Sequence, residues 1–504
     1  MFSKVLIANR GEIACRVIRA CRAMGVKTVA VFSEADTSAL HVRMADEAYC
    51  VGPPPSRESY LRGDVILEVA RRSGADAIHP GYGFLSENAS FREACEAADI
   101  AFVGPPADAM RMMGEKTLAR RTMMAANVPV VPGTADPITD GDTLLRVARE
   151  VGLPVMLKAA SGGGGKGMRV VFEEAELERA FEAAQREARS SFDDDAVYVE
   201  KAIIGPRHIE VQIMADRHGN CVYVGDRECS VQRRHQKVVE ESPAPNLKPE
   251  TRRAMGEMAV QAARAVAYEG AGTIECLVDA DENFYFLEMN TRLQVEHCAT
   301  EEAFGVDLVR AQLMVASGQP LPWGQEDLVC RRHAIELRLY AEDPYENYRP
   351  APGELTVYRP PQGPGVRVDD GVEEGSIISS LYDPMVAKLI VSAEDRESCI
   401  ERALAALGEY EVVGIACNLP LLAFVLRSAP FAAGEYTTGL LDELGALERP
   451  VASEDERDRA RVIAALCQHG DVKRPKADGS SEDVGALSNW AADGLRRQMG
   501  GGLP

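Results

Sequence analysis

Two glutamates in a short hairpin have the spacing of a metal site. Strand-like residues on either side of the segment Ala280 to Asn283 alternate apolar and polar side chains, which is typical of paired β-strands. If the turn pairs Ala280 with Asn283, Glu275 faces Glu288 across the ladder. Two like charges in this position repel each other unless a cation bridges them. Because carboxylates and nucleotide phosphates are typical ligands of Mg²⁺, the hairpin predicts a magnesium site that also holds ATP.

Polar residues continue the same two-residue period beyond the hairpin. Asn290 shares the face of the two glutamates, and Arg292, Gln294 and Glu296 follow at the same spacing if the strand runs on. An arginine and an amide can hold a small planar oxyanion while a carboxylate removes its proton. An exposed edge strand would place one such residue there, not a strict alternation of polar positions. We therefore expect a reaction site on this face.

A glycine-rich segment, residues 161–167, lies between two strand patterns. Successive backbone N–H groups in such a run can surround phosphate oxygens, and Lys166 adds a positive charge. The segment is not a Walker A loop, because Gly167 follows the lysine and a strand pattern comes next. A phosphate loop and a flexible surface turn both stay open. The basic run from Gln232 to Lys237 is a solvated loop by default, and an anion site only if it packs against the carboxylate face.

The elements that must position these residues follow an α/β pattern. Strand patterns at residues 4–8, 28–32, 77–79 and 101–103 alternate with helical stretches, which predicts a parallel sheet with crossover helices. The first turn lacks the pattern Gly-x-Gly-x-x-Gly, so we interpret this segment as a scaffold and not as a dinucleotide site.

Five segments are predicted along the chain. They are an N-terminal domain (1–113), a connecting helix (114–129), a small α/β lid (130–203), a C-terminal domain (204–446) and a polar tail (447–504). Strands and helices alternate in the C-terminal domain without a sequence repeat. The tail is rich in Ser, Asp, Glu, Arg, Gly and Lys, so we expect it to be disordered or to dock a partner.

Composition narrows the class of protein. The chain has 504 residues, 46% hydrophobic and 27% charged, which suits a globular protein of several domains. Its net charge of −22 disfavours nucleic acid or an anionic membrane as a partner. No apolar run reaches the roughly 18 residues of a membrane span, and the N-terminus lacks a signal-peptide pattern, so we expect a cytoplasmic protein. The 12 cysteines include no Cys-x-x-Cys, which predicts reduced core residues.

Four motifs together resemble those of the biotin carboxylases. They are IANRGEIA from Ile7, HPGYGFLSEN from His79, RRHQK from Arg233 and EMNTR from Glu288, and the similarity runs from residue 3 to about 446. The resemblance implies an ATP-grasp fold: a Rossmann-like N-terminal domain, a mobile lid with the glycine loop, and a mixed-sheet C-terminal domain that is α+β in character. It also implies a two-step reaction. ATP phosphorylates bicarbonate to carboxyphosphate, and the CO₂ released from carboxyphosphate is captured by the ureido N1 of biotin.

The same resemblance implies roles for individual residues. ATP would be bound by Lys116, Lys158, Glu200, Lys201, His208, Gln232 and His235, with Gly163, Gly164, Gly165, Lys166 and Gly167 over its phosphates. Mg²⁺ or Mn²⁺ would be held by Glu275, Glu288 and Asn290. Bicarbonate would contact Lys237, Arg292, Gln294 and Val295, of which Lys237 and Arg292 would also act in catalysis. Glu296 would be the general base, Arg338 would stabilise the biotin enolate, and Tyr82 would lie beside biotin.

The sequence departs from the family beside the implied base. Cys298 and Ala299 stand where the family usually has Pro-Val, and a missing proline relaxes the backbone at that position. Every charged residue nearby is retained, so we predict an active ligase. No methionine precedes a lysine, so the Ala-Met-Lys-Met signature of a biotin carrier is missing. We therefore expect two partners, a separate biotin carboxyl carrier protein and a carboxyltransferase.

The final acceptor of the carboxyl group stays open at this point. Residues 337–344 and 382–385 resemble those of propionyl-CoA and methylcrotonyl-CoA carboxylases more than those of the stand-alone acetyl-CoA type. This resemblance favours an acyl-CoA carboxylase of fatty acid metabolism. We also expect a homodimer or a larger complex. The alternatives are the biotin carboxylase subunit of a pyruvate carboxylase, another ATP-grasp ligase, a non-catalytic scaffold and a Rossmann-fold oxidoreductase. Biotin-dependent ATP turnover separates a biotin carboxylase from another ATP-grasp ligase.

Overall fold

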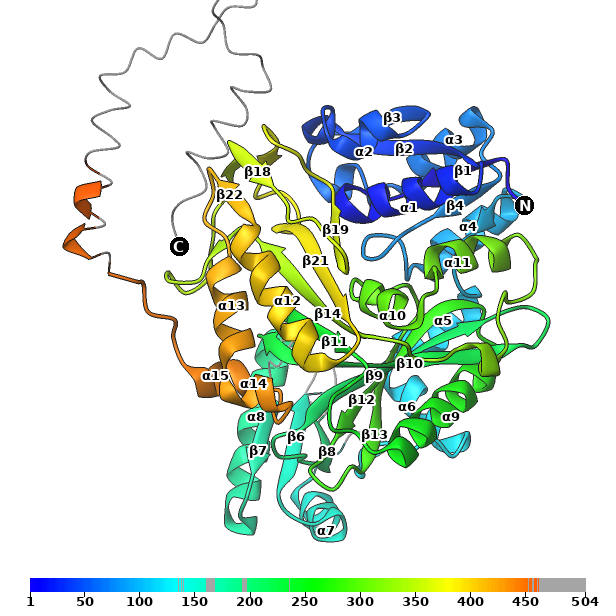
Figure 1. The fold of residues 1–504 in the computed structure, drawn as a ribbon. Helices are drawn as coiled ribbons and strands as arrows, with labels where there is room; N and C mark the ends of the chain where they lie inside the picture. The colour runs from blue at the N-terminus through cyan, green and yellow to red at the C-terminus, as the bar shows by residue number, and fades with distance from the viewer. Residues whose placement is uncertain are drawn as a thin grey trace, which may run out of the picture. The chain divides into compact units, whose positions relative to one another are not determined.

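A computed structural model describes most of the chain. It covers residues 1–134, 136, 138, 140–159, 168–192, 197–234, 236–451, 453–455, 457–459 and 461. The chain divides into two units, Met1–Leu447 and Glu448–Pro504, and the first of them contains the three main sheets (Figure 1). Most of the predicted tail, 447–504, lies outside the described residues.

The N-terminal sheet is parallel, with the strand order β3-β2-β1-β4-β5. Its elements are β1 (Lys4–Ile7), α1 (Gly11–Ala23), β2 (Lys27–Ser33), β3 (Glu47–Gly52), α3 (Gly63–Ser73), β4 (Ala77–His79), α4 (Ala89–Ala97) and β5 (Ala101–Phe102). The predicted α/β class is confirmed, since the four expected strands form with crossover helices between them. Strand β3 was not expected, because all of its residues except the buried Val51 are exposed or only partly buried.

A smaller antiparallel sheet with the order β7-β6-β8 forms within the predicted lid segment. Its elements are α7 (Gly141–Val151), β6 (Val155–Ala159), β7 (Met168–Val171), α8 (Leu177–Phe192) and β8 (Val197–Lys201). Helices α5 (Ala107–Gly114) and α6 (Lys116–Ala125) come before it in the chain. The core of this piece is its own, because a separate cluster of buried residues around Leu144 and Leu157 fills it.

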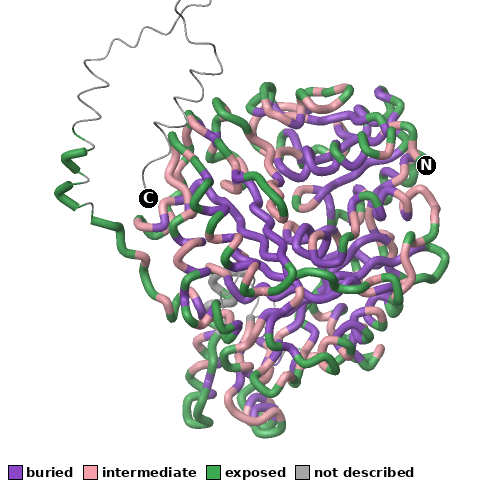
Figure 2. The backbone as a smooth tube through the Cα atoms, viewed as in Figure 1, coloured by how far each residue is buried: buried purple, intermediate pink, exposed green. Residues whose placement is uncertain are grey.

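An eight-stranded antiparallel sheet forms the largest part of the molecule, in the order β13-β12-β9-β10-β11-β14-β21-β19. The strands are β9 (Arg207–Ala215), β10 (Cys221–Arg233), β11 (Gln236–Ser242), β12 (Gly270–Val278), β13 (Phe284–Asn290), β14 (His333–Tyr340), β19 (Val366–Asp370) and β21 (Met385–Ala393). Figure 2 shows that the backbone is buried along the central strands of this sheet. The antiparallel pairing confirms the predicted α+β character of this part.

Alternation along β9 separates an apolar face from a polar face. Ile209, Val211 and Ile213 pack into a core with helix α9 (Pro249–Ala265). The residues between them point to the opposite face, where helix α10 (His297–Phe304) lies against strands β10 and β14. A two-residue period in one strand therefore sends charged side chains under α10 and apolar ones under α9.

The remaining elements are short helices and two-stranded pairs. The α-helices are α2 (Leu40–Met44), α11 (Leu308–Ala316), α12 (Arg396–Glu409), α13 (Leu419–Arg427), α14 (Ala429–Ala433) and α15 (Leu440–Leu444). The short strands are β15 (Glu342–Asp343), β16 (Arg349–Pro350), β17 (Gly353–Glu354), β18 (Val357–Arg359), β20 (Ile377–Ile378) and β22 (Glu411–Val413). The 3₁₀ turns are Glu34–Asp36, Ser56–Glu58, Glu174–Glu176 and Gln325–Asp327. Among the described residues every cysteine is free, and no helix has the length and apolar character needed to cross a membrane.

One buried carboxylate fastens α12 to the large sheet and predicts a pH dependence of stability. Glu241 on β11 accepts hydrogen bonds from Arg396 Nε at 2.7 Å and from Tyr436 Oη at 2.5 Å, and its Oε2 lies 2.6 Å from His333 Nε2. Burial alone would raise the pKa of Glu241, but His333 and Arg396 lower the pKa to about 2 from the usual 4.5.

Because the pKa of Glu241 is depressed in the folded state, its stabilisation is complete above pH 4.5 and is lost as the pH falls toward 2. We expect wild type to lose about 3 kcal/mol of unfolding free energy from this group over that window. Glu241→Gln should be less stable than wild type above pH 4.5, and its free energy of unfolding should not show this loss as the pH falls. The measurement is urea denaturation at several pH values, with the exposed Glu257→Gln as a matched control. An identical pH profile for Glu241→Gln and wild type would contradict the assignment.

Candidate functional site

The hairpin of β12 and β13 brings the two predicted metal-binding glutamates opposite each other. Glu275 pairs with Glu288, as predicted. The predicted turn pairing is nevertheless wrong by one residue, because Asp279 N–H donates to the Asn283 carbonyl at 3.0 Å. A β-bulge between the pairs formed by Glu275 and Cys276 restores the register. The two carboxylates therefore face each other because of a bulge that the sequence pattern does not reveal.

Glu275 is the most heavily contacted carboxylate of the hairpin. Its Oε1 accepts hydrogen bonds from Lys237 Nζ at 3.0 Å, Asn290 Nδ2 at 2.9 Å and Gln294 Nε2 at 2.8 Å. Its Oε2 lies 3.0 Å from His208 Nε2. Burial would raise the pKa of Glu275, but the charges of Lys237 and His208 lower the pKa far below its usual range. Glu275 is therefore ionised throughout the neutral pH range.

The facing carboxylates fit a hard divalent cation. Glu288 is exposed at the open side of the hairpin, and partial desolvation together with the charge of Glu275 raises its pKa. An oxygen-only pair of this kind suits Mg²⁺ or Mn²⁺, which would remove the repulsion. Ligand atoms of His208, Glu210 and Glu275 also lie within 4.8 Å of one another, but Lys237 Nζ already contacts Glu210 at 2.6 Å. The pair across the hairpin is therefore the candidate metal site.

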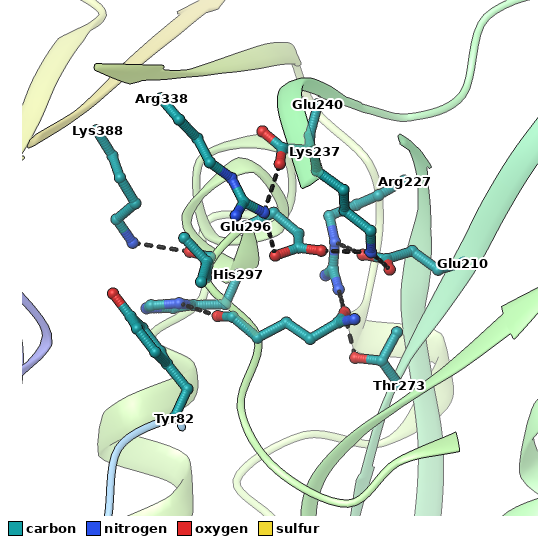
Figure 3. Close-up of polar contacts among 12 residues, drawn as sticks. Tyr82, Glu210, Arg227, Lys237, Glu240, Thr273, Glu296, His297, Arg338 and Lys388 are labelled. Carbon is teal, nitrogen blue, oxygen red and sulfur yellow. Dashed lines mark hydrogen bonds and ion pairs between the residues drawn. The ribbon is translucent and has the colours of Figure 1, made fainter. Parts of the chain in front are cut away.

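Lys237 and Arg338 hold Glu296 from two sides (Figure 3). Lys237 Nζ donates to Glu296 Oε1 at 2.6 Å, and an Arg338 nitrogen donates to Glu296 Oε2 at 2.9 Å. Burial would raise the pKa of Glu296, but Lys237, Arg338 and Arg227 lower the pKa well below its usual range. The structure thus places an ionised carboxylate between two cations, next to the candidate metal site.

The strand that carries Glu288 does not continue to Glu296, which corrects one expectation. Strand β13 ends at Asn290, residues 291–296 form a loop, and α10 begins at His297. Gln294 and Glu296 still reach the cluster from this loop. Arg292 contacts Asn290 Oδ1 at 2.7 Å and Glu87 Oε2 at 3.0 Å. The convergence predicted from strict alternation is therefore produced by a loop and not by a strand.

Sequence reasoning missed Arg227, the largest fully buried charged side chain under α10. It donates to Glu210 Oε1 at 2.5 Å, to Gln212 at 2.8 Å and to Gln294 at 2.7 Å. A bulge in β10 places it opposite Glu210, and Gly225 in that bulge has φ +86°. The polar alternation of His208, Glu210 and Gln212 in an otherwise apolar strand was the signal that a buried cation faces them.

The residues expected to contact ATP are spread over both antiparallel sheets. In the lid segment Lys158 Nζ contacts Glu200 at 2.5 Å, whereas Lys201 Nζ donates to the backbone carbonyls of Gly152 and Leu153. Lys116 is the first residue of α6. In the large sheet Gln232 Nε2 lies 3.5 Å from His208 Nδ1. The glycine loop Gly163 to Gly167 and His235 lie outside the described residues.

Tyr82 and Val295 complete the set of predicted residues. Tyr82 Oη donates to Glu12 Oε2, and Lys388 Nζ lies 3.3 Å from Glu12 Oε1. Lys388 Nζ also donates to the Val295 carbonyl at 2.7 Å. The N-terminal domain is thereby connected to the loop that ends at Glu296.

Three family models match successive parts of the chain. The model of the biotin carboxylase N-terminal domain matches residues 1–110, that of the ATP-binding domain of carbamoyl-phosphate synthase L chain matches 115–323, and that of the biotin carboxylase C-terminal domain matches 336–443. Biotin carboxylase of Halalkalibacterium halodurans is 52% identical, covering 88% of this chain and 97% of that protein.

Related proteins belong to different carboxylases. The propionyl-CoA carboxylase alpha chain of Ruegeria pomeroyi is 48% identical, covering 96% of this chain and 74% of that protein. One of the pyruvate carboxylase subunits of Methanothermobacter thermautotrophicus is 51% identical, covering 90% of this chain and 94% of that protein. The biotin carboxylase domain of a Hydrogenobacter thermophilus 2-oxoglutarate carboxylase, solved as a dimer with MgADP, ADP and bicarbonate, has a TM-score of 0.82 at 44% identity and covers 89% of this chain and 100% of that one. With these matches and this site, the chain belongs to the biotin carboxylase family and is a ligase of the ATP-grasp fold.

Proposed function

We propose that this ligase uses ATP and bicarbonate to carboxylate biotin on a separate carrier protein. The observation that carries the proposal is the position of Glu296, an ionised carboxylate held by Lys237 and Arg338 within the same cluster as the Glu275–Glu288 pair. The related 2-oxoglutarate carboxylase domain, which was solved with MgADP and bicarbonate, supports the choice of ligands.

The side chains of the cluster suit distinct steps of this reaction. Lys237, Arg292 and Gln294 would hold the planar bicarbonate anion, with the Val295 backbone beside it. Glu296 would accept the bicarbonate proton, because a bound anion weakens the hold of both cations on the carboxylate. Arg338 cannot lose its charge and would neutralise the biotin enolate oxygen near Tyr82. The hydrogen bonds of Gln294 to Glu275 and of Arg338 to Glu296 support these roles.

ATP would lie between the lid segment and the large sheet. The residues that would contact ATP are Lys116, Lys158, Glu200, Lys201, His208, Gln232 and His235. Residues 163–167 would cover its phosphates as part of a mobile lid. The proposed segments of the chain end at residues 113, 129, 203 and 446. Glu275, Glu288 and Asn290 would hold Mg²⁺ or Mn²⁺, which would offset the negative charge of the phosphates. The facing carboxylates of β12 and β13 support this placement.

The acceptor is proposed to be an acyl-CoA, transferred by a partner carboxyltransferase. The 48% identity to a propionyl-CoA carboxylase alpha chain supports this choice. A pyruvate carboxylase is the second candidate, because the related pyruvate carboxylase protein is 51% identical over a comparable length. Purification of the native complex, followed by carboxylation assays with acyl-CoA esters and with pyruvate, tests the choice. Fixation of bicarbonate into pyruvate alone would reverse it.

Glu288→Gln is the direct test of the metal site. Its carboxamide keeps the shape but removes one anionic ligand, so we expect biotin-dependent ADP release to fall about 100-fold. The Mg²⁺ concentration that gives half-maximal turnover should rise.

The measurement is ADP release by purified protein with Mg-ATP, bicarbonate and free biotin. The control is Asp281→Asn, an equivalent change at an exposed residue of the same hairpin, which should leave turnover within about 2-fold of wild type. Wild-type protein that releases no ADP in response to biotin would refute the proposed function and favour a scaffold.

A further inference from the structure

A second pair of glutamates faces each other inside the large sheet. Glu240 on β11 is directly opposite Glu336 on β14. Both side chains are fully buried, at 0% exposure. Among the described residues, none of the four carboxylate oxygens of Glu240 and Glu336 has a hydrogen-bond partner of regular geometry, so the two side chains differ only in the ion pairs that they make. Two ionised carboxylates in this position would repel each other without water to screen them, so an uncompensated pair is not stable.

Glu240 and Glu336 differ in how closely a cation contacts them. Arg338 contacts Glu240 Oε1 at 2.5 Å, so Glu240 has a partner for its charge. Lys388 acts more strongly on Glu336 than Arg338 does, but its ammonium donates to the Val295 carbonyl at 2.7 Å and to Cys298 Sγ at 3.1 Å. The geometry therefore favours an ionised Glu240 and a neutral Glu336.

The titratable and charged groups around the pair come from every neighbouring element. They are Lys237 on β11, Cys229 on β10, Arg338 and Tyr340 on β14, Lys388 on β21, Glu296 directly before α10 and Cys298 within it. Burial raises the pKa of Glu336 well above its usual range, against the charge of Lys388, and the charge of Glu240 raises it further. Burial also raises the pKa of Glu240, to about 7, against the charge of Arg338. These directions agree with the geometry.

Arg338 lies between two anions as a result (Figure 3). One guanidinium nitrogen contacts Glu240 Oε1 at 2.5 Å and Glu296 Oε2 at 2.9 Å. A guanidinium held by one anion alone is free to rotate about that contact, whereas two opposed anions fix its plane. The position of Arg338 is thus set by Glu240 on the neighbouring strand β11 as well as by Glu296 in the loop before α10.

We propose that Glu240 and Glu336 hold one proton between them, carried by Glu336, and that ionised Glu240 is a positioning residue that holds Arg338 for the carboxylation of biotin. The role of Glu240 rests on the proposed function, whereas the location of the proton does not. Glu240 contacts neither substrate nor metal in this arrangement, so its effect on the reaction is exerted through Arg338.

Two isosteric variants separate the members of the pair. A carboxamide resembles a protonated carboxyl group, so Glu336→Gln should keep biotin-dependent turnover within about 2-fold of wild type. Glu240→Gln removes the anion beside Arg338 and should lower kcat about 10- to 100-fold, with a smaller change in the KM for free biotin. Glu240→Asp keeps the charge and should recover part of the loss. Equal losses in Glu240→Gln and Glu336→Gln would overturn the proposal.

The pH dependence of turnover is a further test, because a purely structural role of Glu240 would not change it. At a fixed bicarbonate concentration, wild-type turnover should fall as the pH drops through about 7, because Glu240 then gains a proton and releases Arg338. The turnover of Glu240→Gln should be low at every pH and should show no such fall near pH 7. A step of the same size in Glu240→Gln would show that another group titrates, and would overturn the role of Glu240.

Infrared difference spectroscopy locates the proton without any turnover. A protonated carboxyl group has a carbonyl band that a carboxylate lacks, and wild type at pH 8 should show such a band that disappears in Glu336→Gln. Persistence of the full band in folded Glu336→Gln would overturn the location of the proton. If wild type lacked biotin-dependent turnover, the proposed function and the role of Glu240 would fail together, whereas the band would still decide where the proton lies. Circular dichroism confirms that each variant is folded.

Discussion

Glu296→Gln is expected to lower biotin-dependent ATP turnover about 1000-fold, because general-base catalysis by a positioned carboxylate contributes about 10²- to 10⁴-fold. The carboxamide keeps the shape of the side chain but cannot accept the bicarbonate proton. Lys237 retains Glu210 and Glu275, and Arg338 retains Glu240, so neither cation is left without a partner. The variant should therefore fold normally.

The measurement for this variant is ADP release with bicarbonate and free biotin, beside a thermal unfolding curve. Glu302→Gln in helix α10, which begins directly after Glu296, is the matched control, because it makes the same chemical change outside the cluster and should stay within about 2-fold of wild type. Turnover within 10-fold of wild type in Glu296→Gln would exclude Glu296 as the base and leave it as a structural partner of Lys237 and Arg338.

Arg227→Met is expected to have the largest effect on stability. Methionine is apolar and fills part of the space, but it leaves Glu210 with Lys237 alone and removes the donor to Gln212 and Gln294. Removing one partner of a buried ion pair costs about 3–5 kcal/mol. We expect a loss of this size in the free energy of unfolding, together with weaker bicarbonate use, since Gln294 is no longer held.

Chemical denaturation measures this loss, and Arg253→Met supplies the control. Arg253 lies on α9 with a largely exposed side chain and a contact of 3.9 Å to Glu257, so its replacement should change stability by at most about 0.5 kcal/mol. Arg227→Lys keeps the charge and should recover part of the stability. Equal stabilities of Arg227→Met and Arg253→Met would show that the buried network contributes nothing.

Local sequence patterns were enough to predict the main strands and helices and the pairing within one hairpin. The parallel sheet followed from alternating strand and helix patterns, and the facing of Glu275 and Glu288 followed from one hairpin. Even there the bulge that sets the register was invisible, because it depends on how β13 meets the rest of the fold. Strand β3 was missed because its partly exposed residues carry no apolar period.

The candidate site is formed by contacts between residues far apart in the sequence, and local sequence periodicity does not predict such contacts. Arg227 reaches Gln294 across 67 positions of sequence, and Arg338 reaches Glu296 across 42. The roles of Lys237 and Arg338 came from family resemblance, whereas Arg227 belonged to none of the motifs used and was missed. Alternation alone placed Glu296 correctly in the cluster but for an incorrect reason, since a loop and not a strand carries it there.

The ammonium group of Lys388 joins three stretches of chain that fold far apart in the sequence. It contacts Glu12 of helix α1, the Val295 carbonyl and Cys298 Sγ. The geometry of the loop before α10 is thus imposed by neighbours and not by its own backbone. A fragment that lacks the first domain should therefore hold this loop less firmly, because the contact of Lys388 with Glu12 would be lost.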